Sequence, residues 1–288
     1  MKLPPIDYLN PESVEEVVQL LGKREDAKIL SGGQSLMPML AFRVANSSVL
    51  IDLRRVPGID HIRVDESGIE LGAKVRWRDI ERDTRLAAAH PLLVEAVSHI
   101  AHYQIRNRGT VGGSLAHADP AAELPAIALT CEAQIIAVGP RGQREIPAAE
   151  FFLAPLITAL EPDELIVAMR LPVWPEARRF GFKEFSRRSG DFALAGAAVF
   201  FDLDENGRIS APHVGAFGIA DTPVRLRETE VALEGKLPEN TMLAEAVKLG
   251  TSGLEIRNDI HADADYRRAL LETLLMRALE AATQRMHS

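Results

Sequence analysis

Apolar positions near the start of the chain follow first a helical and then an extended pattern. One stripe has helical spacing and comprises Val14, Val17, Val18 and Leu21. It predicts a helix opened by Asn10-Pro11, with Asn10 as the cap and Pro11 at the first helical position. The apolar runs Lys28–Leu30 and Ser48–Asp52 predict strands, and Pro57-Gly58 predicts a turn at which a subdomain ends.

Short strands and helices alternate in the middle of the chain. Apolar runs predict strands at 62–64, 69–71, 133–138 and 164–171. Helical patterns predict helices at 77–80, 91–100 and 124–129. The prolines of Pro172-Val-Trp-Pro175 predict a hinge, because each favours extended backbone in the residue before it. Residues 1–175 are therefore predicted to form one domain, with subdomains at about 1–57 and 58–175.

The rest of the chain, residues 176–288, has a different pattern. Strands are predicted at 180–186, 195–203 and 209–219, and helices follow at 228–233, at 243–249 and from 265 onward. An antiparallel sheet backed by helices fits this order. The sequence thus predicts an α+β protein with a larger N-terminal domain and a smaller C-terminal domain.

Two glycine segments carry the candidate chemistry. The segment Ser31-Gly-Gly-Gln-Ser35 follows a predicted strand, and Thr110-Val-Gly-Gly-Ser114 follows a predicted helix. Because Gly109, Gly112 and Gly113 can take positive φ, we expect a loop whose N–H groups face phosphate oxygens, so that the two segments clamp one pyrophosphate. Neither has the spacing of a P-loop or of a Rossmann turn. The alternative for each segment is a structural turn that binds nothing.

These two segments, with the run Ala-His-Ala-Asp-Pro-Ala-Ala-Glu after the second, resemble the FAD-binding medium subunit of molybdenum hydroxylases. That family includes the flavoprotein subunit of carbon monoxide dehydrogenase and the FAD domain of xanthine dehydrogenase. The resemblance extends nearly end to end. It implies a two-subdomain FAD-binding domain of the vanillyl-alcohol-oxidase-like type, with the flavin held between it and the C-terminal domain.

The resemblance also implies which residues bind FAD. They are Leu30, Ser31, Gly32, Gly33, Gln34, Ser35, Ile100, Thr110, Val111, Gly112, Gly113, Ser114, His117, Asp119, Glu123, Ile166 and Lys183. Glu123 stands where relatives usually carry Asp. Lys183 matches a lysine that relatives place near the flavin from the second domain, where a cation would stabilise the reduced, anionic ring. Arg187, Arg188 and Asp191 belong to the same signature, although an exposed ion pair explains them nearly as well.

Several of these residues have other interpretations. Asp119 could instead cap a helix that begins near Pro120, and Ile100 and Ile166 could be ordinary core residues. Arg106 and Arg108 could offset pyrophosphate charge or face a partner subunit. His117 and Asp119 lack a third ligand, so no metal site is assigned.

No catalytic residue is assigned, because a bound flavin carries the redox chemistry itself and no hydrolase or nucleophile motif occurs in the sequence. The single cysteine, Cys131, lies between apolar neighbours and is expected to be buried. One cysteine cannot hold an iron–sulfur cluster through four thiolates, so clusters are expected in a partner.

Composition narrows the setting of the protein. A net charge of −8 with a pI near 5.6 argues against nucleic acid as a partner. No apolar run approaches the roughly 20 residues of a membrane span, and the first residues do not resemble a signal peptide. We therefore expect no membrane insertion and a cytoplasmic location.

The resemblance implies a role in electron transfer. The chain would be the FAD subunit of a molybdenum-containing hydroxylase, assembled with an iron–sulfur small subunit and a molybdopterin large subunit as a dimer of heterotrimers. It would take electrons from [2Fe-2S] clusters and pass them to an external acceptor. The alternatives are a stand-alone FAD-dependent oxidase or dehydrogenase of a small molecule, and a non-catalytic assembly module whose glycines only make turns.

Overall fold

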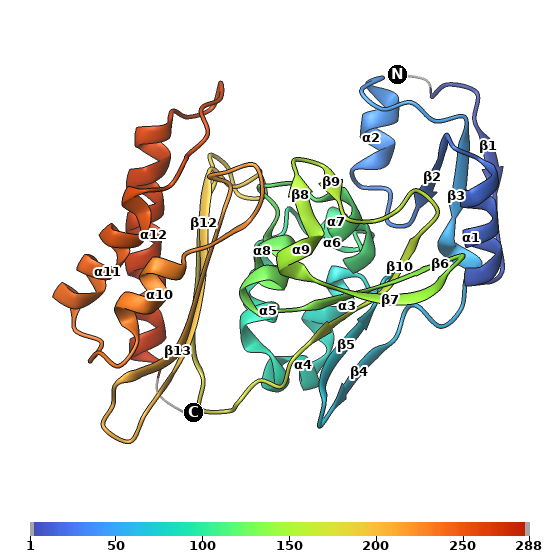
Figure 1. The fold of residues 1–288 in the computed structure, drawn as a ribbon. Helices are drawn as coiled ribbons and strands as arrows, with labels where there is room; N and C mark the ends of the chain where they lie inside the picture. Colours follow the sequence, from blue (N-terminus) through green and yellow to red (C-terminus); the bar gives the residue numbers. More distant parts are fainter. Residues whose placement is uncertain (1–2, 286–288) are drawn as a thin grey trace.

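The computed structural model describes residues 3–285, which form three sheet-and-helix units side by side (Figure 1). A three-stranded, a five-stranded and a four-stranded sheet follow one another along the chain, with one small two-stranded hairpin. The architecture is α+β, as predicted. Among residues 3–285, no helix combines the length and the apolar character needed to cross a membrane.

The first unit is a small parallel sheet. Its strands β1 (Asp7–Leu9), β3 (Val49–Asp52) and β2 (Ala27–Leu30) lie in the order β1-β3-β2, and every residue of the central strand β3 is buried. Helix α1 (Val14–Lys23) packs its apolar stripe against this sheet. Its cap is Ser13, whose hydroxyl accepts from the N–H of Glu16 at 3.1 Å. The expected Asn10 cap is therefore wrong, because Asn10 lies too far before the first helical turn.

The second unit is an antiparallel sheet of five strands. Its order is β4 (Ile62–Asp65), β5 (Gly68–Gly72), β10 (Leu165–Leu171), β6 (Gln134–Gly139) and β7 (Gly142–Pro147). One face carries apolar side chains such as Ile69, Ile135 and Met169, which pack under helices. Leu165, from the other side of β10, packs with the first unit. The sheet thus joins the N-terminal unit to the helices.

Short helices cover the apolar face of this sheet. They are α3 (Trp77–Arg82), α4 (Thr84–Ala89), α5 (Pro91–His99), α6 (Tyr103–Arg106), α7 (Val111–His117), α8 (Glu123–Thr130) and α9 (Ala148–Phe151). The hairpin of β8 (Phe152–Ala154) and β9 (Ile157–Thr158) follows them. The sequence patterns predicted α3, α5 and α8. They missed α4, α6, α9 and the hairpin, which are too short to show a clear periodicity.

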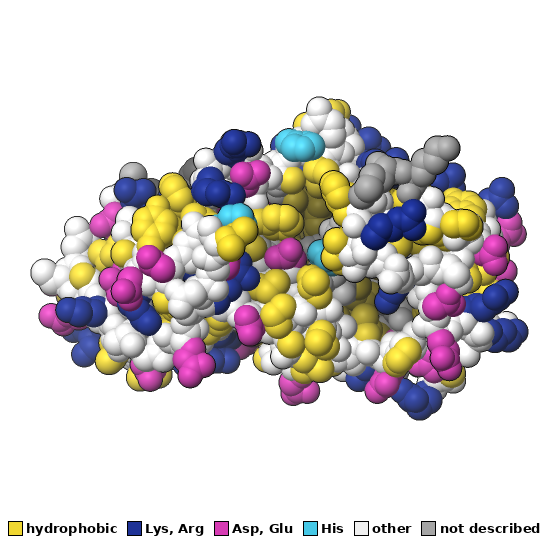
Figure 2. All heavy atoms as spheres, turned by 90° about the horizontal axis from the view of Figure 1, so that it is seen from above, with side chains coloured by type: hydrophobic (Ala, Val, Ile, Leu, Met, Phe, Trp, Pro, Cys, Tyr) yellow, Lys and Arg dark blue, Asp and Glu magenta, His cyan; other side chains and the backbone are white. Residues whose placement is uncertain are grey.

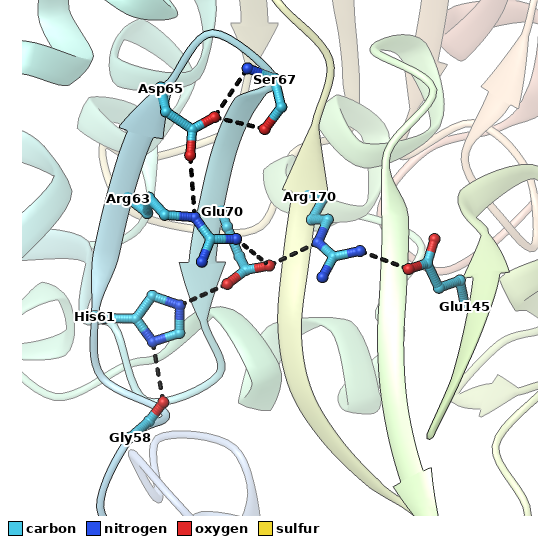
Figure 3. Close-up of polar contacts among 8 residues, drawn as sticks. All are labelled: Gly58, His61, Arg63, Asp65, Ser67, Glu70, Glu145 and Arg170. Atoms are coloured by element: carbon cyan, nitrogen blue, oxygen red, sulfur yellow. Dashed lines mark hydrogen bonds and ion pairs between the residues drawn. The ribbon is translucent and has the colours of Figure 1, made fainter. Parts of the chain in front are cut away.

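A ladder of charged side chains covers part of the opposite face of the five-stranded sheet (Figure 3). Glu70, on β5, binds Arg170 at 2.6 Å, Arg63 at 3.0 Å and His61 at 2.8 Å. Arg170 continues the ladder to Glu145 on β7. Burial alone would raise the pKa of Glu70, but hydrogen bonds from Arg170 and His61 and the charges of Arg63 and Arg170 outweigh it, and the pKa is lowered. The ladder therefore links β4, β5 and β10 and reaches across β6 to β7.

The third unit is an antiparallel sheet, as predicted. Strands β11 (Arg179–Phe185), β12 (Ala195–Leu203), β13 (Ile209–Phe217) and β14 (Val224–Arg225) lie in sequence order. Helices α10 (Arg227–Leu233), α11 (Asn240–Ser252) and α12 (Ala264–Gln284) lie on its outer side (Figure 1). Helices α5 and α8 of the second unit pack against its other face.

The segment between the second and third units is packed rather than free. The ring of Trp174 lies 4.4 Å from that of His90 and 5.1 Å from that of Phe200, between centroids. Arg178 lies over the same Trp174 ring and pairs with Asp202 at 2.8 Å. Burial lowers the pKa of His90 to about 3, so this imidazole is neutral. Trp174 therefore anchors the predicted hinge between two packed layers.

Candidate functional site

A cavity of about 740 Å³ lies where the first two units meet and is closed on one side by the third. Figure 2 shows a hollow in the middle of the upper face, with hydrophobic side chains around it. Its walls come from β2, the loop after it and α2 (Leu36–Ala41), from residues 100–123, from β10, and from residues 190–192. The volume suits a cofactor rather than a metal ion or a water molecule.

The first wall is the loop of residues 31–35, between β2 and α2 (Leu36–Ala41). Gly33 has φ +73°, which glycine adopts at little cost. Gly32 approaches the other segment so closely that a Cβ on it would lie 2.3 Å from the carbonyl oxygen of Arg108. The N–H groups of residues 32–35 have no acceptor within residues 3–285. They are donors available to a ligand.

The second wall differs from the loop we expected. Residues 111–117 form helix α7, and Thr110 is its cap, accepting from the N–H of Gly113 at 3.2 Å. Neither Gly112 nor Gly113 has positive φ. Gly112 is needed for close packing instead, since a Cβ there would lie 2.7 Å from the Cβ of Ala73. The prediction of a flexible glycine loop is wrong here, because the glycines sit inside the first turn of a helix.

The N–H groups of this helix start are already used. Those of Val111 and Gly112 donate to Val75 and Ala73 carbonyls at 3.0 and 2.9 Å, and that of Ser114 donates to the carbonyl of Thr110 at 3.0 Å. The Thr110 hydroxyl lies 3.0 Å from that of Ser31 and so joins the two walls. The second wall therefore offers hydroxyl groups rather than backbone donors.

Glu123, His117 and Asp119 are titratable side chains of the second unit that line the cavity. Burial raises the pKa of Glu123 to about 8, with the charges of Glu184 and Asp119 adding to it and a backbone N–H opposing it. Burial lowers the pKa of His117, against the charge of Asp119. Both Glu123 and His117 are therefore mainly neutral at pH 7. Asp119 accepts from the N–H of Ala121 at 2.9 Å and shapes a turn, and the following helix begins at Glu123 rather than near Pro120.

The third unit contributes only Gly190, Asp191 and Phe192 to the described lining. Lys183, expected near the flavin, is not part of it. A Cβ on Gly181 would lie 2.1 Å from the carbonyl of Ala278 on α12, so position 181 faces the helices. Side chains alternate along a strand, so Lys183 lies on the same helix-covered face. β11 directs its even-numbered residues, including Glu184, toward the second unit, and the contact of Lys183 with the flavin stays a prediction.

Most of the other predicted residues do meet at the cavity. Its lining includes Ser31, Gly32, Gly33, Gln34, Ser35, Ile100, Thr110, Gly112, Gly113, Ser114, His117, Asp119, Glu123 and Ile166. Leu30 and Val111 do not line it; Val111 is fully buried in the core, and Leu30 lies beneath Gly33. Arg106 forms an ion pair with Glu81 at 3.0 Å, so its positive charge is balanced within the chain.

Sequence reasoning missed part of the lining. Ala101, His102, Leu156 and Leu160 line the cavity but belong to no motif. A positive φ at Ala101 (+41°) and at Leu156 (+61°) marks two of these positions, and this feature cannot be read from the residue type. Cys131 is buried, as expected, and burial raises the pKa of its thiol to about 12. Within residues 3–285, no group of three or more His, Cys, Asp or Glu side chains is placed to hold a metal.

The site offers free backbone N–H groups on one wall and hydroxyl groups on the other, in a largely apolar cavity. Such donors suit the oxygens of a phosphate and of a polyol chain, and the apolar part suits a planar ring system.

Comparison with known proteins covers nearly the whole chain. Residues 4–174 match the family described as "FAD binding domain in molybdopterin dehydrogenase", and residues 180–282 match the "CO dehydrogenase flavoprotein C-terminal domain". The chain is 40% identical to subunit alpha of the 6-hydroxypseudooxynicotine dehydrogenase complex of Paenarthrobacter nicotinovorans, over 99% of this chain and 97% of that protein.

Two further likenesses agree. The carbon monoxide dehydrogenase medium chain of Hydrogenophaga pseudoflava is 36% identical, over 98% of each chain. A solved structure of quinoline 2-oxidoreductase from Pseudomonas putida 86 superposes with a TM-score of 0.94 at 36% identity, covering 99% of both chains. The likeness therefore extends over all three units.

Proposed function

The chain belongs to the family of FAD-binding medium subunits of molybdenum hydroxylases, and we propose that it binds one FAD in the cavity and acts as the electron exit of such an enzyme. Membership confirms the resemblance seen in the sequence and makes the chain an oxidoreductase subunit.

This proposal is supported chiefly by the hydrogen-bond donors that two opposite walls of the cavity present to the space between them. The free N–H groups of residues 32–35 face a pyrophosphate, and the hydroxyls of Ser31, Thr110 and Ser114 approach it or the adjoining sugar chain from the other side. The glycines keep Cβ atoms out of the space between the walls. Glu123, protonated at neutral pH, donates a hydrogen bond to a cofactor oxygen or nitrogen.

FAD supplies the electron exchange when it is bound, and the chain binds, orients and shields it. In this proposal the chain receives electrons from [2Fe-2S] clusters of a small subunit, after oxidation of a substrate at the molybdopterin of a large subunit, and passes them to an external acceptor. Two heterotrimers assemble as a dimer in the cytoplasm. Residues 1–175, in subdomains of about 1–57 and 58–175, bind FAD, and residues 176–288 close the site.

A visible absorption spectrum tests this proposal. FAD is added to the full chain alone and to the chain with its co-purifying subunits. We expect flavin bands near saturation that bleach on addition of substrate only in the full complex. Steady turnover of a small alcohol by the isolated chain would favour a stand-alone oxidase. No bound flavin in either sample would favour an assembly module and overturn the proposal.

A further inference from the structure

One loop brings the third unit to the cavity. It connects β11 to β12, spans residues 186–194, and provides all the lining that comes from beyond residue 175 in the described chain. Gly190 (φ +84°) packs against the backbone of Ala101, and a Cβ on it would lie 3.1 Å from the Ala101 carbonyl carbon. Phe192 is 67% exposed, so little apolar packing holds the tip of the loop.

The end of this loop is held by a buried arginine on α12. Arg267 is fully buried and is the largest fully buried side chain among the described residues. Its Nη1 donates to the Leu194 carbonyl at 2.5 Å and to the Gly218 carbonyl at 2.8 Å. Its Nη2 donates to Asp259 at 2.6 Å. A buried guanidinium needs such partners, and two of the three are backbone groups at the end of the loop and just after β13.

The same guanidinium also reaches the second unit through the backbone. The N–H of Gly218 donates to the carbonyl of Pro120 at 2.8 Å, and Pro120 follows the cavity residue Asp119. The N–H of Leu194 donates to the carbonyl of Phe185 at 2.8 Å and closes the base of the loop. Arg267 therefore lies at the point where the loop, the end of β13 and the cavity wall meet.

Asp259 completes the arrangement from the segment between α11 and α12. Burial would raise the pKa of its carboxyl, but Arg267 and two backbone N–H groups outweigh this effect and lower the pKa to about 2. Arg257 lies 3.5 Å from the same carboxylate. The carboxylate is charged across the physiological range and balances the buried cation.

We propose that Arg267 is a positioning residue for FAD: through the carbonyls of Leu194 and Gly218 it fixes the loop that closes the cavity, without itself lining the cavity. This inference rests on the proposed FAD site. It implies that cofactor affinity depends on a side chain of α12, and that the loop loosens when the guanidinium is removed even if no FAD is present.

The neighbouring Arg268 supplies a matched control. It also donates to two backbone carbonyls, those of Thr251 and Leu254, but both belong to α11 and the segment after it. Arg267→Met and Arg268→Met thus remove the same group from adjacent positions of one helix. Only the first removes contacts to the loop of residues 186–194.

The first measurement uses trypsin on the full-length, FAD-free chain. Arg187 and Arg188 lie exposed in the loop and are cleavage sites. We expect cleavage after them to be about tenfold faster in Arg267→Met than in the wild type, and unchanged in Arg268→Met, because cleavage follows the open population of the loop. Equal rates in both variants would overturn the proposal. Because no FAD is present, this result does not depend on the proposed function.

The second measurement is the dissociation constant for FAD, with the visible circular dichroism of the bound flavin. Arg267→Met is expected to weaken binding about tenfold and to change the dichroism, Arg267→Lys to restore part of both, and Arg268→Met to change neither. If Arg267→Met does not fold, Asp259→Asn replaces it and should give a smaller change in the same direction. If the variant that folds binds FAD as tightly as the wild type does, the inference about Arg267 is contradicted. If the wild-type chain itself binds no FAD, the proposed function is contradicted instead.

Discussion

The two glycine segments look alike in sequence but use their glycines for different physical reasons. In residues 31–35, Gly33 takes positive φ, Gly32 lies against the backbone of Arg108, and the N–H groups of residues 32–35 have no acceptor in the described part of the chain. In residues 110–114 the glycines belong to a helix, and Gly112 lets it lie against Ala73. The first segment presents donors to a ligand, and the second fixes the position of the wall opposite. Similar motifs therefore do not imply similar contributions to binding.

Gly32→Ala should show the largest effect. The added Cβ would lie 2.3 Å from the carbonyl oxygen of Arg108, and a backbone atom cannot move aside as a side chain can. We expect a loss of about 3 kcal/mol in the free energy of unfolding, measured in urea, together with loss of FAD binding. Gly22→Ala is the control, since nothing lies within 4 Å of a Cβ there in α1, and it should stabilise the chain by up to about 1 kcal/mol. A Gly32→Ala chain with wild-type stability would contradict the close approach of the two walls.

Gly112→Ala should come next. Its Cβ would meet the Cβ of Ala73 at 2.7 Å and push α7 away from the residues after β5. We expect a loss of about 2 kcal/mol in the free energy of unfolding, even though alanine favours a helix more than glycine does. At Gly113 the only close atom is the Thr110 hydroxyl, so Gly113→Ala should cost less. The reverse order would mean that the second segment is a loop after all.

Glu123→Gln tests a difference in titratable groups between the two walls. The wall that includes residues 110–123 carries such groups, and the lining of residues 31–35 does not, so only the first should make the stability depend on pH. The pKa of Glu123 is raised from 4.5 to about 8, so the unfolded chain loses its proton first and wild-type stability falls as pH rises between these values. Glutamine removes this loss. In urea unfolding of the FAD-free chain, we expect the variant to gain nothing at pH 4 and about 2 kcal/mol at pH 6.

The control for this pH effect is Glu66→Gln, at an exposed glutamate between β4 and β5. It should differ from the wild type by the same amount at both pH values. A gain for Glu123→Gln that does not change with pH would show that the carboxyl is ionised in the folded chain.

Thr110→Ala should have the smallest effect of the series. It removes the cap bond to Gly113 and the bond to Ser31, and we expect a loss of about 1 kcal/mol in the free energy of unfolding. Ser31→Ala removes only the second bond and should cost less. A double-mutant cycle of the two substitutions measures the bond that joins the walls. Thr110→Ser keeps both hydrogen bonds and serves as the control. If the effects of Thr110→Ala and Ser31→Ala are additive, a direct bond between the two hydroxyls is excluded.

The sequence alone determined the type and order of the longer elements and the family. Periodic apolar positions are local, so they located α1, α5, β10, β12 and the C-terminal helices, and the family resemblance indicated most of the cavity residues named in advance. The short elements α4, α6, α9 and the β8–β9 hairpin escaped, because so few positions carry no reliable period. The cap of α1 also escaped, since Asn10 and Ser13 are both good caps in sequence.

Only the tertiary structure decided the use of each residue. The faces of β11 depend on how the sheet packs between α12 and the second unit, and this placed Lys183 on the helix-covered face and Glu184 toward the second unit. The acceptors of the α7 N–H groups come from residues 73 and 75, distant in sequence, and Arg267 holds a carbonyl 73 positions away. Contacts between distant residues leave no local pattern, so the sequence indicated what lines the site, and the packing determined which of its groups are free to bind.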